Sequence, residues 1–249
     1  MKIIPLSEGA FSIDTTKVFV PFNKDTDDLQ DRSRGSLLVE VQPFAIVTSR
    51  DILLMDTGLG FADASGIPLI HKNLMEAGIH PGEITKVLLS HLHKDHSGAI
   101  SYQHPQSGTT QLCFPNAIYY VNKQEFELAM SGDTSSYQRQ SFEILENNDQ
   151  VVFTEASGNI DNYIRYEVTQ AHSRFHQVFW IEEEGEIIFF GGDDAPQLGQ
   201  MRRKFVAKYD YDGNKSRQLR ELWWEQGLKE NWTFLFYHDI KSPYLRRDH

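Results

Sequence analysis

Apolar and polar positions along the chain fall into short runs, most of which predict strands. Before the first expected helix, strands are predicted at residues 17–20, 37–41, 44–48 and 51–55. Each run is four or five residues long and contains β-branched or large apolar side chains, which is typical of strands. Residues 23–35 contain few apolar side chains and are predicted to form a long polar loop.

Helical spacing of apolar residues appears in three segments, residues 67–77, 123–130 and 215–228. In the last of these, Leu219, Leu222, Trp223 and Gln226 are expected to share one face. The remaining strands are predicted at residues 87–90, 117–121, 151–153, 163–168, 177–181, 186–190 and 232–237. With no linker or low-complexity stretch between them, these elements predict a single domain, residues 1–249, of mixed sheets with helices outside.

Charge and composition narrow the functional classes. The 249 residues carry a formal net charge of −11, which repels nucleic-acid phosphates and anionic membranes at long range. The densest basic runs, residues 202–204 and 246–247, are short and are interpreted as solvated surface. The single cysteine, Cys113, permits no intrachain disulfide. Without a signal-peptide pattern or an apolar run of ~20 residues, a soluble cytoplasmic protein is expected.

Four potential metal ligands lie within six residues, directly after an apolar run. They are His91, His93, Asp95 and His96. A lone histidine is usually structural, but leaving three imidazoles and a carboxylate unpaired in a dry interior would cost several kcal/mol. Imidazole nitrogen and carboxylate oxygen suit zinc, iron or manganese. A single ion cannot easily take all four, so two neighbouring metal sites are predicted.

Two metal sites need more ligands than this segment provides. His172, Asp193 and His238 each follow a predicted strand, and open sheets often carry their sites just beyond strand ends. Asp193 follows Gly191-Gly192, where glycine permits close approach of the backbone. Asp194 is its neighbour and an alternative ligand. Four other histidines, His71, His80, His104 and His249, have no partner in the sequence and are interpreted as surface residues.

The H-x-H-x-D-H pattern of residues 91–96 resembles the signature of the metallo-β-lactamase superfamily. Supporting segments occur in the family's order at Asp56-Thr57-Gly58, Phe114-Pro115-Asn116-Ala117, residues 171–176, Gly192-Asp193 and His238. Within the superfamily, the chain most resembles the lactonase and organophosphate-hydrolase-like branch. The residues that carry this resemblance are 210–216 and His238 followed by Ser242-Pro243. Ala171 and residues 173–175 depart from the usual pattern at the mouth of the site.

The resemblance implies an α+β fold, an αββα sandwich in which two mixed sheets pack face to face with helices on both outer faces. It assigns His91, His93 and His172 to one metal, Asp95, His96 and His238 to the other, and Asp193 to a bridge between them. Asp56 would orient a ligand imidazole. Arg174, Phe175 and Tyr137 are candidates for the substrate rim, with residues 23–35 and 133–140, and His176 is expected to be structural.

Such a site predicts hydrolysis. Two divalent ions, most simply zinc, with two carboxylates and a bridging hydroxide leave about one positive charge to stabilise a developing oxyanion. The expected reaction is hydrolysis of an ester, lactone or related small-molecule bond, with Asp95 carrying the proton to the leaving group. A phosphodiesterase or ribonuclease and a non-hydrolytic di-iron redox or sensor protein are the alternatives. The di-iron relatives typically have Glu at the position of His93. A homodimer is left open.

Overall fold

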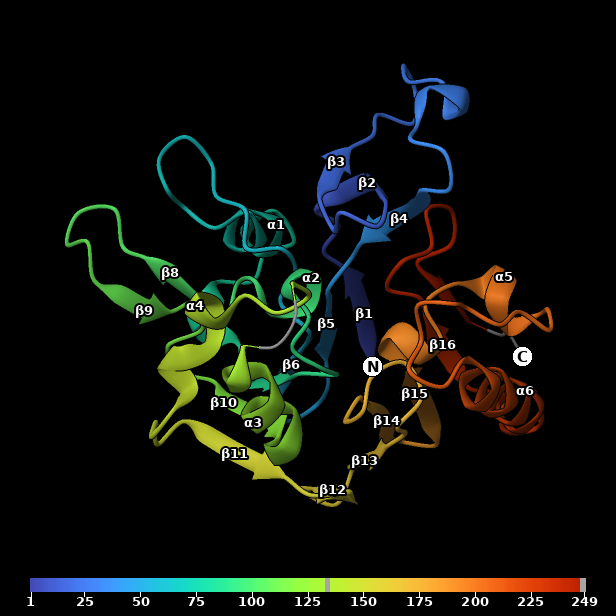
Figure 1. The fold of residues 1–249 in the computed structure, drawn as a ribbon. Coiled ribbons are helices and arrows are strands. Elements are labelled where there is room, and N and C mark those ends of the chain that lie inside the picture. The colour runs from blue at the N-terminus through green and yellow to red at the C-terminus, as the bar shows by residue number, and fades with distance from the viewer. Residues whose placement is uncertain (133–134, 247–249) are drawn as a thin grey trace.

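Two six-stranded sheets stand face to face in the structure, a computed structural model that describes residues 1–132 and 135–246 (Figure 1). The first sheet has the strand order β1 (Lys2–Pro5), β5 (Phe44–Val47), β6 (Ile52–Met55), β7 (Lys86–Leu88), β10 (Ile118–Asn122) and β11 (Val151–Thr154). The second has the order β12 (Ser157–Ile160), β13 (Ile164–Val168), β14 (Gln177–Glu183), β15 (Glu186–Phe190), β16 (Thr233–Leu235) and β17 (Tyr244–Leu245). Both sheets are mixed, because each contains parallel and antiparallel pairs.

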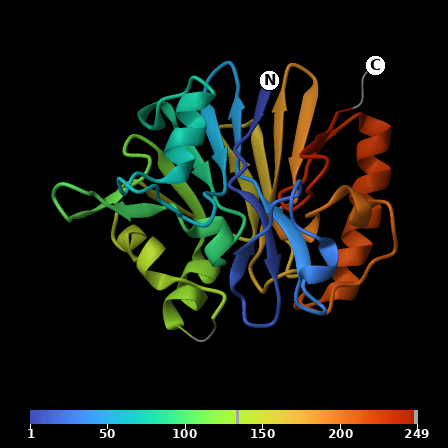
Figure 2. The same cartoon turned by 90° about the horizontal axis from the view of Figure 1, so that it is seen from above.

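Helices cover the two outer faces (Figures 1 and 2). Beside the first sheet lie α1 (Leu69–Glu76), α2 (Lys94–Ser97), α3 (Lys123–Ser131) and α4 (Arg139–Phe142), with the 3₁₀ turns η2 (Pro81–Glu83) and η3 (Glu143–Leu145). Beside the second lie α5 (Leu198–Met201) and α6 (Gly213–Glu230), with η4 (Gly192–Asp194). A smaller sheet of β3 (Phe19–Pro21), β2 (Gly9–Ile13) and β4 (Leu37–Val41), with η1 (Leu29–Asp31), and a hairpin of β8 (Ser101–Gln103) and β9 (Thr110–Leu112) complete the fold.

Three apolar clusters separate the layers. One lies between the first sheet and its helices, one between the sheets, and one between the second sheet and α5 and α6. In β14, Phe179 and Ile181 enter the cluster between the sheets, whereas Val178 and Trp180 enter the cluster under α6. This alternation follows from the two-residue period of a strand. The predicted sandwich of two mixed sheets with outer helices is therefore confirmed.

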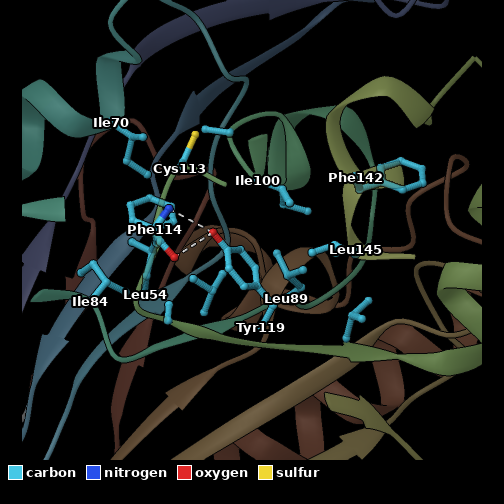
Figure 3. Close-up of a cluster of buried hydrophobic side chains, with 14 of the residues drawn as sticks. Leu54, Ile70, Ile84, Leu89, Ile100, Cys113, Phe114, Tyr119, Phe142 and Leu145 are labelled. Carbon is cyan, nitrogen blue, oxygen red and sulfur yellow. Dashed lines mark hydrogen bonds between the residues drawn. The ribbon is translucent and has the colours of Figure 1, made fainter. Parts of the chain in front are cut away.

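A hydrogen bond joins two residues inside one of these clusters. In the cluster between the first sheet and its helices, the backbone N–H of Phe114 donates to the Tyr119 hydroxyl at 3.1 Å (Figure 3). Cys113 lies in the same cluster and is buried. Its interpretation as a small core residue therefore fits its position, and burial raises the pKa of its thiol far above the usual value.

Some predictions about elements were wrong. The sequence pattern did not indicate β1 and β2, because Pro5 and Ser7 interrupt the apolar run, and it did not indicate β8, β9 or β12. The predicted face of α6 is also displaced. Leu222 is 57% exposed, and the buried side of the helix carries Ser216, Arg220, Trp223 and Gly227. Gly227 is required there, since a Cβ would lie 2.2 Å from the Phe234 ring.

The histidines interpreted as partnerless surface residues also need correction. His71 is half-buried, and its Nε2 lies 2.8 Å from the carbonyl oxygen of Cys113. The His80 ring accepts a hydrogen bond from the backbone of Gly82 and caps η2. The His71 contact joins residues 42 positions apart, whereas the His80 contact lies within a single local turn. His249 lies outside the described residues.

Candidate metal centre

The histidine-rich segment changes conformation halfway along. His93 has extended dihedral angles (φ −60°, ψ 148°) and caps α2, so His91 and His93 precede the helix while Asp95 and His96 lie in its first turn. Two fully buried leucines, Leu89 and Leu92, fix the segment in the apolar cluster of the first sheet. The turn into α2 therefore divides the four predicted ligands into two pairs.

The structure brings all seven predicted metal ligands together. His91, His93, His172 and Asp193 each offer one ligand atom within 4.8 Å of the others, and Asp95, His96 and His238 form a second such group. The contributing elements are far apart in sequence, because His172 follows β13, Asp193 lies in η4 after β15, and His238 follows β16. Both groups therefore lie at one edge of the sandwich.

Asp193 lies between the two groups. Its Oδ2 is 3.2 Å from His172 Nε2 in the first group. Its Oδ1 is 3.2 Å from His96 Nε2 and 2.9 Å from His238 Nε2 in the second. Gly192 makes this approach possible, since a Cβ there would meet His176 at 2.6 Å and its φ of +48° disfavours larger residues. One carboxylate oxygen thus faces each group.

Several of these atoms are buried and lack a hydrogen bond. They are His91 Nε2, His96 Nε2 and Asp193 Oδ1. Buried polar atoms without partners are rare in proteins, because each carries the full cost of desolvation. Lone pairs that converge without protein partners, on imidazole and carboxylate groups, fit divalent metal ions. The residues present therefore fit the metal centre that the sequence predicts.

The electrostatics agree with this fit. Burial and neighbouring imidazoles hold the pKa values of His91 and His93 well below the usual value, so both rings are neutral and keep a free lone pair. Burial is the largest influence on His96, His172 and His238 as well and opposes their protonation, but Asp193 and the other nearby carboxylates together outweigh it and raise their pKa values. The same three rings hold the pKa of Asp193 well below its usual range despite its burial.

Four of the five predicted ligand imidazoles have their second ring nitrogen held in place. Asp56 Oδ2 lies 2.7 Å from His96 Nδ1, which is the contact the sequence predicts for this carboxylate. Asp56 also accepts hydrogen bonds from the backbone and hydroxyl of Ser90, and that hydroxyl is 3.0 Å from His91 Nδ1. Such contacts fix the orientation of a ligand ring and its tautomer.

The other two contacts come from residues to which sequence analysis gave no role. Asp210 Oδ1 lies 2.9 Å from His172 Nδ1, and the carbonyl oxygen of Glu40 lies 2.7 Å from His238 Nδ1. Asp210 begins the segment, residues 210–216, that carries the resemblance to the lactonase branch, but that resemblance assigned it no contact with a ligand. A backbone carbonyl gives no sequence signal at all.

Asp194, the alternative bridge, has a different place. It is fully buried and accepts hydrogen bonds from the backbone of His172 at 2.7 Å and from the Thr169 hydroxyl. His176 Nδ1 lies 3.0 Å from its Oδ2, and His176 Nε2 accepts the backbone N–H of Asp193 at 3.1 Å. Asp194 and His176 therefore hold the loops that carry the predicted ligands, and they do not enter either group.

The predicted rim residues lie at different depths. Tyr137 pairs with His93 in an isolated bridge, and its ring centre is 5.1 Å from the imidazole. Its hydroxyl donates to the buried carboxylate of Glu125, which also accepts the backbone N–H of Leu92. Arg174 is exposed and Phe175 half-buried. Residues 133–134 of the predicted rim lie outside the described residues.

The predicted polar loop, residues 23–35, is connected to the site through one side chain. Lys24 Nζ lies 3.1 Å from Glu40 Oε2 and 3.4 Å from the carbonyl oxygen of Ile240. These two residues flank the backbone around His238. The loop therefore supports that part of the site from outside.

Glu8 is a buried carboxyl that sequence analysis did not identify. Its Oε2 accepts the backbone N–H of Leu59 at 2.6 Å, and its Oε1 is buried without a hydrogen bond. Burial, aided by the negative charge of Asp95, raises the pKa of Glu8 to about 7 against the Leu59 hydrogen bond. The carboxyl packs directly against Gly58, where a Cβ would lie 2.6 Å from it.

Replacing Glu8 with glutamine should stabilise the metal-free protein at high pH. In the unfolded chain the carboxyl ionises near pH 4.5, but in the folded chain it stays protonated until about pH 7. The folded state therefore binds more protons in this window, and stability falls as pH rises through it. Glutamine keeps the acceptor for Leu59 but cannot ionise. We expect Glu8→Gln to gain up to about 3 kcal/mol over the native chain by pH 8 and almost nothing at pH 4. Urea unfolding in chelator across this range tests it, and a constant difference would contradict it.

Comparison with known proteins adds the family. Residues 40–223 match the family model described as the metallo-beta-lactamase superfamily. An atrochrysone carboxyl ACP thioesterase from Passalora fulva is 29% identical over 143 residues, which are 57% of this chain and 34% of that protein. The match thus spans about a third of the relative's length.

Solved structures share the fold. A probable metal-dependent hydrolase from Staphylococcus aureus has a TM-score of 0.80 at 22% identity, covering 98% of this chain and 91% of its own. The dizinc quorum-quenching lactonase AidC has a TM-score of 0.70 at 19% identity, covering 98% and 89%. The hydrolase AbOPH, described as in the beta lactamase superfamily, has a TM-score of 0.74 at 18% identity, covering 98% of this chain and 89% of its own. No helix in the described part of the chain is both long and apolar enough to cross a membrane.

Proposed function

The chain belongs to the metallo-beta-lactamase superfamily and is a metal-dependent hydrolase of that family. We propose that it binds two divalent ions and hydrolyses an ester, thioester or lactone bond of a small molecule. The observation that carries the proposal is the position of Asp193, which presents one oxygen to each of two ligand groups. The chain would act as a single domain, since the apolar cluster between the sheets takes residues from both of them.

Each proposed site has a complete set of donors. His91, His93 and His172 would hold one ion, Asp95, His96 and His238 the other, and Asp193 would contact both. Zinc suits this set, and iron and manganese accept the same ligands. The contacts of Asp56, Asp210 and the Glu40 carbonyl keep three of the imidazoles aimed at the ions.

Two divalent ions held this way would supply a hydroxide at neutral pH and polarise the substrate carbonyl. The chain's own residues complete the reaction. Hydrolysis would add water across the bond: the carbonyl carbon would gain an oxygen, its bond to the leaving oxygen or sulfur would break, and the leaving atom would take a proton. Asp95 is the proposed carrier of that proton, because its carboxylate lies in the second group, 3.5 Å from His238 Nε2 and 3.6 Å from His96 Nε2.

A substrate panel on the zinc-loaded protein tests the proposed bond type. We expect at least one lactone, carboxylic ester or thioester to be hydrolysed with a kcat/KM at least tenfold, or about 1.4 kcal/mol, above that of a nitrophenyl phosphodiester or phosphotriester. The protein treated with chelator is the control and should be inactive. Turnover of phosphodiesters alone would reject the proposal in favour of a phosphodiesterase.

A further inference from the structure

A basic segment, residues 202–215, stands out in an acidic protein. It contains five cationic side chains and two carboxylates, a net charge of +3, so the rest of the chain carries −14. The cations are Arg202, Arg203, Lys204, Lys208 and Lys215. The sequence alone gave no reason to separate this segment from ordinary solvated surface.

These cations have no anionic partner in the structure. Within residues 1–132 and 135–246, no carboxylate lies within 4.0 Å of the five side chains. The segment's own carboxylates are engaged elsewhere, because Asp210 contacts His172 Nδ1 and Asp212 accepts the backbone N–H of Lys215 to cap α6. The positive charge of the segment is therefore available to a ligand.

The basic segment is fixed against the metal centre. The backbone N–H of Tyr211 donates to the carbonyl of His172 at 3.0 Å, and that of Asp212 donates to the carbonyl of Ala171 at 2.8 Å. The Tyr209 ring centre is 6.1 Å from that of His172. A single buried guanidinium, Arg220, donates to the carbonyl oxygens of both Asp194 and Phe205. Arg220 therefore connects the basic segment to the loop that carries Asp193.

Exposed apolar and aromatic side chains are interleaved with the cations. Phe205 and Val206 are 41% and 43% exposed, Tyr209 is 40% exposed and Tyr211 is 61% exposed. The guanidinium of Arg174, close to His172 in sequence, lies 5.4 Å from the Tyr211 ring centre. Arginine and lysine recognise phosphate, and aromatic faces stack on bases and other planar groups. The combination suits a phosphorylated, base-bearing group better than a bare carboxylate.

Depth separates this surface from the proposed reaction centre. The predicted metal ligands are largely buried, whereas most of the cations and rings of the basic segment are exposed. A ligand that contacted both the metal centre and the basic segment would place its scissile bond among the buried predicted ligands and a charged group on the exposed surface. The −14 charge of the remaining chain would repel an anionic group from other parts of the surface, so that this group would bind preferentially at the basic segment.

We propose that residues 202–215, with Arg174, bind the phosphorylated nucleotide end of an acyl thioester of the coenzyme A type. This inference rests on the proposed function, because the hydrolysis occurs at the metal centre. Water is consumed, the carbon–sulfur bond breaks, and the products are a carboxylic acid and the free thiol, which remains attached to its phosphates. The basic segment supplies binding and steering of the substrate and takes no part in bond breaking.

The test compares two thioesters of the same acyl group, one of coenzyme A and one of the neutral thiol N-acetylcysteamine. With the zinc-loaded protein at low salt, we expect kcat/KM to be at least tenfold higher for the coenzyme A thioester, within the range of electrostatic steering. The ratio should fall toward one as ionic strength rises and the Debye length shortens. The double variant Lys204→Glu/Lys208→Glu should lower it at least tenfold. Lys229→Glu, an exposed charge reversal at the far end of α6, should leave it unchanged.

Direct binding separates the two proposals. Coenzyme A itself, measured by titration calorimetry, should bind the native chain and not the double variant. If coenzyme A binds but neither thioester is hydrolysed, the basic segment is supported and the proposed reaction fails. If the neutral thioester is hydrolysed without preference for coenzyme A, the reaction stands and this inference is overturned. Binding restricted to a phosphopantetheinylated carrier protein, or to a single-stranded RNA oligonucleotide, would also overturn it.

Discussion

Replacing Asp193 with alanine should lower kcat/KM for the best substrate by at least ~10³-fold, which corresponds to about 4 kcal/mol of transition-state stabilisation. The reason is its position, because its two oxygens lie within 3.2 Å of imidazole nitrogens in both ligand groups. Removing it takes one donor from each proposed metal site at once. It also removes the charge that raises the pKa values of His96, His172 and His238.

The measurement pairs steady-state kinetics with metal analysis. Asp193→Ala should retain fewer than two equivalents of zinc after dialysis, and circular dichroism should show a folded chain, because the backbone contact with His176 does not depend on the side chain. Asp63→Ala is the matched control, since Asp63 accepts hydrogen bonds within an exposed turn. A variant at position 193 that keeps full activity and two equivalents of zinc would show that the bridge is assigned to the wrong residue.

The sequence predicts which side chains the structure brings together, because the chemistry of potential ligands is recognisable locally. His91, His93, Asp95 and His96 lie within six residues, and few other environments tolerate such a cluster. His172, Asp193 and His238 could be placed because each follows an apolar run that ends at the same edge of a sheet. Individual elements such as β14 and the helix after residue 67 could be predicted from short-range patterns, whereas the layered sandwich was expected from the family resemblance.

The parts that the sequence did not predict depend on contacts between distant residues. Asp210 orients His172 across 38 positions, and Glu8 acquires its raised pKa from burial against a turn 50 positions away. In α6 the buried face runs through Arg220, a residue that hydropathy places outside, because its guanidinium donates to two backbone carbonyls and to the Ser216 hydroxyl. Tertiary hydrogen bonds thus override the helical pattern at this position. The proposed role of the basic segment could not be predicted for the same reason, because it depends on how the backbone of the segment is attached to His172.

Removing metal and returning it stepwise should distinguish one working ion from two. Chelation should abolish hydrolysis, and saturating zinc should restore it and raise the melting temperature by about 10–20 °C, as expected for two sites each filled by zinc about 100-fold above its Kd in a chain of this size. Activity should lag behind the added metal. With one equivalent per chain and independent sites of equal affinity, about a quarter of the chains hold both ions.

The shape of this titration is informative whatever the relative affinities of the two ligand groups. If the group containing His91 binds much more tightly than the group containing His96, activity stays near zero until one equivalent and then rises. If both fill together, activity follows the fraction of fully loaded chains. His93→Ala and Asp95→Ala, which remove one donor from different groups, should each leave about one equivalent bound with little turnover. Full activity at one equivalent or less would refute a dinuclear mechanism, and Asp193 would then serve as a ligand to one ion and a hydrogen-bond partner to the imidazoles of the other group.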